Sequence, residues 1–128
     1  MLLVALPVFL LAGDIACGQE HMRRLRTPAT VRSFIGGESH DSYVIRARKG
    51  ETMTVQISWR REHGELGDNH AEFFVGKLPD FDGNGRVKFG EESNQGKRWR
   101  GRVPQTGNYY IYVMGHPTAH YTLKVTVR

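Results

Sequence analysis

Apolar and polar residues alternate with a period of two in two segments of the chain, 52–60 and 121–128. The apolar positions are Met53, Val55, Ile57 and Trp59 in the first segment and Tyr121, Leu123, Val125 and Val127 in the second. Successive side chains of a β-strand point to opposite faces of the sheet, whereas a helix would scatter these residues around its circumference. The pattern therefore predicts two strands, each with one buried and one solvated face.

Five further segments have the composition of strands and are separated by residues that favour turns. The strand segments are 42–48, 72–77, 86–89, 98–103 and 108–114, and the turn segments are 49–50, 64–68, 83–85, 104–108 and 115–117. No window shows helical periodicity, and strands spaced by about ten residues are typical of a sandwich. A chain of 128 residues has room for one such domain. We predict an all-β, single-domain protein, an antiparallel β-sandwich of jelly-roll-like type.

The N-terminal residues indicate export. Residues 2–13 form an apolar run with the length of a signal-peptide core, too short to span a bilayer comfortably. Small residues at Ala16 and Gly18 suit cleavage after Gly18. In the alternative, Cys17 is the lipidated cysteine of a lipoprotein and attaches the protein to a membrane. We assign 1–18 to the signal, 19–30 to a flexible basic segment and 31–128 to the sandwich, and expect a periplasmic or secreted protein.

Composition restricts the chemistry. Cys17 is the only cysteine, so neither an internal disulfide nor a multi-cysteine zinc site can form. The formal net charge of +5 favours anionic partners, although nucleic acid is not expected for an exported protein. The sequence contains no Gly-x-Ser-x-Gly, no His-Glu-x-x-His and no phosphate-binding glycine loop. We therefore expect a binding domain rather than an enzyme.

Segment 80–91 matches the EF-hand loop template, with D-x-D-x-N-G at its start and glutamate at its twelfth position. The calcium ligands would be the side chains of Asp80, Asp82, Asn84 and Glu91 and the main-chain carbonyl of Arg86. The flanking segments, 77–79 and 93–96, contain proline, glycine and serine and do not favour helices. The sequence thus predicts a Ca²⁺ site in a loop between strands, with a simple acidic, glycine-rich turn as the alternative.

Three arginines mark a candidate partner-binding strand. Arg98, Arg100 and Arg102 alternate with Trp99 and Gly101, so a strand presents three guanidinium groups on one face. Arginine recognises carboxylates and phosphates through a planar fork of donors. Further arginines that we expect to add to this face are Arg46, Arg48, Arg60 and Arg61. The alternative is a solvated edge strand whose charges prevent aggregation.

Tyrosines and histidines give further candidates. Tyr110 and Tyr112 alternate with apolar residues, and on a solvent-facing sheet surface they would contact sugars or a protein; burial in the core is the alternative. The histidines in loop segments are His63, His70, His116 and His120. Their spacing matches no zinc motif, and we expect them to be solvated.

Three segments together resemble a known family pattern. They are YVIRARKGETMTVQIS (43–58), the W-x-G-x-x-P-x-T-G-x-Y-Y-I-Y-V run (99–113) and YTLKVTV (121–127). The pattern resembles bacterial pre-peptidase C-terminal domains and is similar to periplasmic inhibitors of goose-type lysozyme. The resemblance implies a β-sandwich and an exported binding module. The inhibitors have a longer, arginine-rich loop between their last two strands, and this sequence departs from them because only 115–120 fills that place.

These observations lead to one functional expectation and one alternative. We expect an exported, non-catalytic binding domain, most specifically a protein-interaction module like the lysozyme inhibitors. The alternative is a module that binds carbohydrate or the cell envelope, with anionic glycan as the ligand and with calcium as a stabilising ion. A hydrolase ranks behind both.

Overall fold

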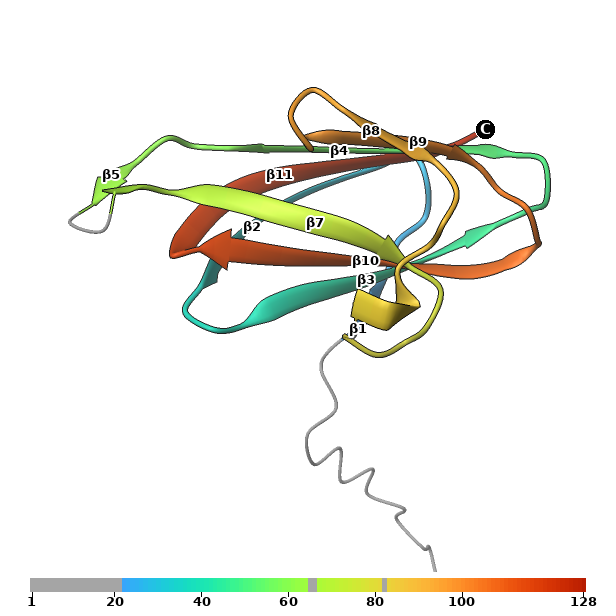
Figure 1. The fold of residues 1–128 in the computed structure, drawn as a ribbon, viewed down its shortest axis with the longest axis horizontal. Helices are drawn as coiled ribbons and strands as arrows, with labels where there is room; N and C mark the ends of the chain where they lie inside the picture. The colour runs from blue at the N-terminus through green and yellow to red at the C-terminus, as the bar shows by residue number, and fades with distance from the viewer. Residues whose placement is uncertain (1–21, 65–66, 82) are drawn as a thin grey trace, which may run out of the picture.

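Two β-sheets pack face to face in the computed structural model, which describes residues 22–64, 67–81 and 83–128. The four-stranded sheet has the order β1-β3-β10-β7, with β1 (Met22–Arg24), β3 (His40–Ala47), β10 (Gly107–His116) and β7 (His70–Gly76). The five-stranded sheet has the order β2-β11-β4-β9-β8, with β2 (Ala29–Gly36), β11 (Thr118–Val127), β4 (Thr52–Trp59), β9 (Arg98–Arg102) and β8 (Glu91–Ser93). Figure 1 shows the two layers. The predicted all-β sandwich is confirmed.

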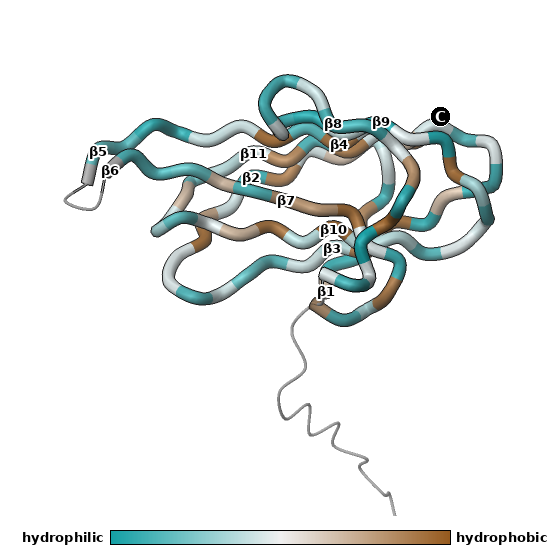
Figure 2. The backbone as a smooth tube through the Cα atoms, in the orientation of Figure 1, coloured by the Kyte–Doolittle hydropathy of each residue, from teal (hydrophilic) through white to brown (hydrophobic). Residues whose placement is uncertain are grey.

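Two small elements complete the fold. The strands β5 (His63–Gly64) and β6 (Gly67–Asp68) form a two-stranded hairpin between β4 and β7, and this hydrophilic hairpin projects from one end of the sandwich (Figure 2). A 3-10 turn, η1 (Gly83–Gly85), follows β7. Within the described residues, no helix is long and apolar enough to cross a membrane.

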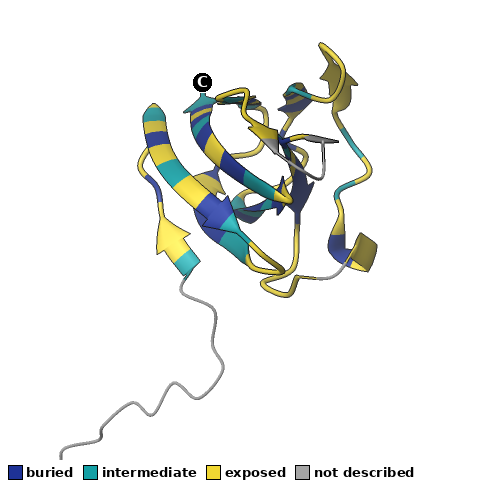
Figure 3. Ribbon diagram, turned by 90° about the vertical axis from the view of Figure 1, so that its left-hand side faces the viewer, coloured by how far each residue is buried: buried dark blue, intermediate teal, exposed yellow. Residues whose placement is uncertain are grey.

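The core lies between the two sheets and is built by the alternating residues of both. Burial alternates along the strands in Figure 3. In β4 and β11 the register pairs Ile57 with Leu123 and Val55 with Val125, and all four side chains are buried. The alternation predicted for 52–60 and 121–128 is therefore confirmed, because the apolar residues of each strand face the other sheet.

Most of the other predicted strands are also present, with one exception. The segments at 42–48, 72–77, 98–103 and 108–114 correspond to β3, β7, β9 and β10. Segment 86–89 is not a strand. Arg86 makes an isolated bridge to Gly76, and the Val87 amide donates to the Val75 carbonyl at 2.9 Å, after which the chain crosses to β8 in the other sheet.

The prediction of a flexible tether at 19–30 is wrong for the described part of that segment. Met22–Arg24 forms β1 and pairs in parallel with β3, Leu25 is buried, and Ala29 begins β2. The pairing of β1 uses main-chain groups of a polar segment, so no apolar alternation announced it. The predicted signal at 1–18 and Cys17 lie outside the described residues.

Candidate binding face

The outer face of the five-stranded sheet carries the predicted arginine strand. In β9, Arg98, Arg100 and Arg102 are exposed, whereas Trp99 and Gly101 are buried against the core. Strand β9 pairs with β4 on one side and with the short edge strand β8 on the other. The three guanidinium groups therefore project into solvent from one surface, as the alternation predicts.

Strand register brings more cations to the same surface. Gln56 of β4 is opposite both Arg98 of β9 and Lys124 of β11. Further along β11, Thr122 is opposite Arg32 of β2. Residues that are directly opposite each other share a sheet face. We call the resulting set the cationic face; it consists of Arg32, Arg60, Arg98, Arg100, Arg102 and Lys124, all of which are exposed.

Acidic side chains near the cationic face form no ion pair with it in the described residues. Glu91 of β8 is the register partner of Arg100. In the part of the chain that the structure describes, however, each ion pair within 4.0 Å involves a histidine: His63–Asp68, His70–Glu72, His116–Glu72 and His120–Glu62. Positive charges gathered on one surface without carboxylate partners create a potential that attracts anions.

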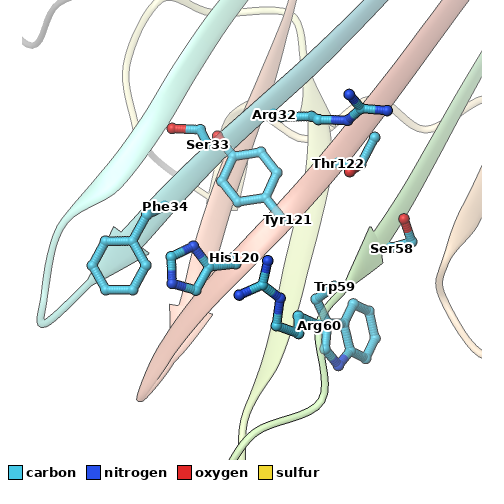
Figure 4. A pocket seen from close by; sticks show the side chains of 9 residues that line it. All are labelled: Arg32, Ser33, Phe34, Ser58, Trp59, Arg60, His120, Tyr121 and Thr122. Carbon is cyan, nitrogen blue, oxygen red and sulfur yellow. The ribbon is translucent and has the colours of Figure 1, made fainter.

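The cationic face is hollowed rather than flat. One hollow of about 480 Å³ is lined by residues of β2, β11 and the end of β4, among them Arg32, Arg60 and Thr122. Figure 4 shows Phe34, His120 and Arg60 side by side at one end of this hollow, with Arg32 and Thr122 at the other. A second hollow of about 670 Å³ is lined by Arg98, Lys124 and their neighbours. The two hollows share Ser58 and Thr122, so they adjoin, and we refer to them together as the depression.

Short polar side chains separate the cations across this depression. Thr54, Gln56 and Ser58 of β4 occupy the outward positions between the two cationic flanks. They are shorter than arginine and lysine, and the exposed guanidinium and ammonium groups on either side are accessible to an incoming partner. Arginine forks suit planar carboxylate and phosphate groups, so the surface is chemically suited to an acidic partner.

One large apolar side chain lies at the rim of the depression. Phe34 of β2 is 53% exposed, and its ring centroid lies 4.6 Å from that of His120. An exposed aromatic ring beside a charged surface is typical of an interface anchor. Its hydrophobicity alone would place this aromatic residue in the core, but the alternation of β2 gives the inward positions to Val31 and Ile35.

The two tyrosines predicted to contact a partner lie on the other sheet. Tyr110 is partly buried on β10, and Tyr112 is 0% exposed. The Tyr112 hydroxyl donates to the Leu78 carbonyl at 2.8 Å, and its ring packs against Phe74 and Phe81. The loop after β7 therefore covers Tyr112, which corrects the prediction of an exposed side chain there.

The predicted calcium ligands are divided between the segment after β7 and a strand of the five-stranded sheet. Asp80, Asn84 and Arg86 lie in the segment that follows β7, where the Lys77 amide donates to the Gly85 carbonyl at 2.8 Å. Glu91 lies in β8 of the five-stranded sheet. Asp82 lies outside the described residues. Calcium binding by this segment stays a prediction.

Sequence reasoning found four of the six residues of the cationic face. It anticipated the three arginines of β9 and Arg60, but it missed Arg32 and Lys124, because only the register of β2 and β11 shows that they share the surface. Three other arginines expected to join are elsewhere. Arg46 is on β3 of the opposite sheet, Arg48 lies beyond the end of β3, and Arg61 lines a groove beside β7.

Comparisons with solved structures place this fold. The periplasmic inhibitor of g-type lysozyme (PliG) from Aeromonas hydrophila matches with a TM-score of 0.62 and 21% identity over 84% of this chain and 96% of that chain. The pre-peptidase C-terminal domain of collagenase from Bacillus anthracis matches with a TM-score of 0.57 and 19% identity over 84% of this chain and 97% of that chain. PliG from Salmonella Typhimurium has a TM-score of 0.57 and 19% identity, over 84% and 98% of the two chains. The chain has the fold of PliG and of pre-peptidase C-terminal domains.

This structural likeness confirms the fold that the family resemblance of the sequence implies. No family model matches the chain, and no curated protein matches it either. Within the PliG-like fold, the last two strands are joined closely: β10 ends at His116 and β11 begins at Thr118. This connection has no room for an arginine-rich loop, and the arginines of the cationic face lie in strands or, for Arg60, directly after one.

Proposed function

We propose that the chain is a non-catalytic binding module that docks an acidic partner on the cationic face. The observation that carries this proposal is the set of six exposed cations on one hollowed sheet surface, where no described carboxylate forms an ion pair with them. Such a surface attracts an anionic partner and orients it during encounter. The exposed Phe34 supplies an apolar contact at the rim.

The partner class that we propose is a protein of lysozyme type in the periplasm or outside the cell. The support is that three of the solved structures with this fold are inhibitors of g-type lysozyme. A protein with carboxylates around its own cleft complements a depression rimmed by arginines. Because β10 and β11 are closely connected, the proposed docking site is the sheet surface rather than a loop.

The first test is inhibition of a g-type lysozyme. The protein is added to the enzyme acting on a peptidoglycan suspension, and the rate of clearing is followed together with calorimetric binding. We expect one-to-one binding and a rate that falls as the protein is added. Binding without inhibition would support docking away from the substrate cleft. Absence of both would contradict the lysozyme version of the proposal.

The second candidate is a module that binds an anionic glycan of the cell envelope. It is favoured by the two adjoining hollows, whose lining residues extend from β2 to β9, because such a row of hollows suits an extended polymer. Affinity electrophoresis in gels that contain polygalacturonate or neutral dextran distinguishes the two. Retention by polygalacturonate alone, without lysozyme binding, would support the glycan candidate. Equal mobility in both gels would contradict it.

A further inference from the structure

Three side chains, two from β7 and one from β10, meet on the outer face of the four-stranded sheet. His116 of β10 is the direct register partner of His70 of β7. Glu72 is the next outward residue of β7, because Ala71 and Phe73 point into the core. The three side chains are partly exposed. This group is separate from the cationic face, which lies on the other sheet.

The ligand atoms of this trio have the separations of a metal site. The Nε2 atom of His70 lies 3.3 Å from Oε1 of Glu72, and Nε2 of His116 lies 3.3 Å from Oε2 of the same carboxylate. All three residues offer ligand atoms within 4.8 Å of one another. Two ligands bound to one tetrahedral Zn²⁺ at about 2.0–2.1 Å are roughly 3.3 Å apart. Small rotations of the side chains would therefore bring three ligands onto one ion.

The main chain around the trio is well anchored. The strands β7 and β10 are paired from Tyr110–Gly76 to His116–His70. Just before His70, the buried Asn69 side chain accepts a hydrogen bond from the Glu62 amide at 2.7 Å and donates one to the Arg60 carbonyl at 2.9 Å. Both histidines are thus fixed at their Cα positions, which lowers the entropy cost of gathering them around an ion.

We propose that His70, Glu72 and His116 form a binding site for a divalent transition-metal ion, with Zn²⁺ as the best fit. Two imidazoles and one carboxylate are a ligand set that zinc accepts, whereas Ca²⁺ and Mg²⁺ prefer oxygen ligands alone. Three protein ligands leave one coordination position open to solvent. The adjacent groove is lined by Arg61, Arg86 and Lys97, and these cations favour an anion, such as hydroxide or a carboxylate, at that position.

Zinc titration of the tag-free protein in a calorimeter tests the site. We expect one Zn²⁺ per chain, with affinity at least about tenfold weaker in Glu72→Gln and in His116→Gln, because each variant removes one of three ligands. His120→Gln is the matched control, since His120 lies on the other sheet, and it should bind zinc as the unmodified protein does. Equal affinity in the unmodified protein and both site variants would overturn the proposal.

A second measurement uses tryptophan fluorescence and does not depend on heats of binding. The ring centroids of Trp59 and His70 are 6.5 Å apart, so Cu²⁺ bound by the trio is close enough to quench Trp59 emission. Cu²⁺, like Zn²⁺, binds imidazole ligands. We expect quenching that saturates at one equivalent and that Trp59→Phe largely removes. Quenching unchanged in His116→Gln, with its circular dichroism spectrum intact, would contradict the site.

Discussion

The Tyr121 hydroxyl donates a hydrogen bond to the Asp41 carboxylate, with 2.5 Å between Oη and Oδ2. Tyr43 joins them, because its hydroxyl lies 2.5 Å from that of Tyr121. Asp41 and Tyr43 belong to β3 and Tyr121 belongs to β11. A polar contact thus connects the two sheets across an interface whose buried residues are mostly apolar. Burial raises the pKa of Tyr121 above its usual range, and the hydrogen bond to Asp41 raises it further.

Replacing Tyr121 with phenylalanine should lower the free energy of unfolding by about 1–3 kcal/mol, because a buried hydrogen bond to a charged group is lost. Urea unfolding measures the change. The control is Tyr110→Phe, at a partly buried tyrosine on the outer side of β10, which should change stability by less than about 0.5 kcal/mol. Equal effects of the two substitutions would contradict the role assigned to Tyr121.

The same group predicts a loss of stability at alkaline pH. The folded protein holds the Tyr121 proton because its pKa is raised, whereas the unfolded chain releases it above about pH 10. Below that pH both states keep the proton. Above it the free energy of unfolding falls by up to about 1.4 kcal/mol per pH unit. Melting temperatures between about pH 9.5 and 11 should therefore fall more steeply in the unmodified protein than in Tyr121→Phe; parallel curves would contradict this.

Gly90 is required where the chain crosses from η1 to β8. Its φ is +87°, and a Cβ atom there would lie 2.4 Å from the Trp99 ring. Gly96 has a similar φ of +79° but open space around its Cα. Gly90→Ala should therefore destabilise by at least about 1 kcal/mol more than Gly96→Ala in thermal or urea unfolding. Equal costs would show that backbone conformation alone decides the effect.

Calcium binding by segment 80–91 is tested by melting the protein in chelator and then in millimolar Ca²⁺. A ligand that binds the native state raises the melting temperature by mass action. We expect a rise that Asp80→Ala removes and that Asp68→Ala, at an exposed carboxylate in the β5–β6 hairpin, leaves in place. Identical melting curves in calcium and chelator would reduce the segment to a turn.

The alternation of apolar and polar residues was sufficient to predict the strands whose faces are cleanly divided. It identified β4, β9 and β11 because every inward residue there is apolar or glycine. It missed β2, in which Ser33 takes an inward position and Phe34 an outward one. It could not find β1, whose residues contribute main-chain pairing rather than core.

The sites depend on contacts between strands that are distant in sequence. The arginines of β9 were predictable because they lie within one strand. Lys124 and Arg32 join them only through the pairing of β11 with β4 and β2. His70 and His116 likewise meet only through the register of β7 with β10. Local periodicity predicts which face a residue takes, whereas strand order and register decide which residues share that face.

The central claim is that the cationic face docks the partner, and a matched pair of charge reversals tests it most directly. Arg100 lies on that face, whereas Arg46 is an exposed arginine on the outer side of β3 in the opposite sheet. Both substitutions to glutamate change the net charge equally.

Affinity for a g-type lysozyme, and in parallel for polygalacturonate, is measured at about 0.15 M salt. The account predicts that Arg100→Glu weakens binding of the true partner at least about tenfold, or roughly 1.4 kcal/mol, and that Arg46→Glu changes it less than about threefold. Equal weakening by both reversals, or no binding to either probe by the unmodified protein, would contradict it.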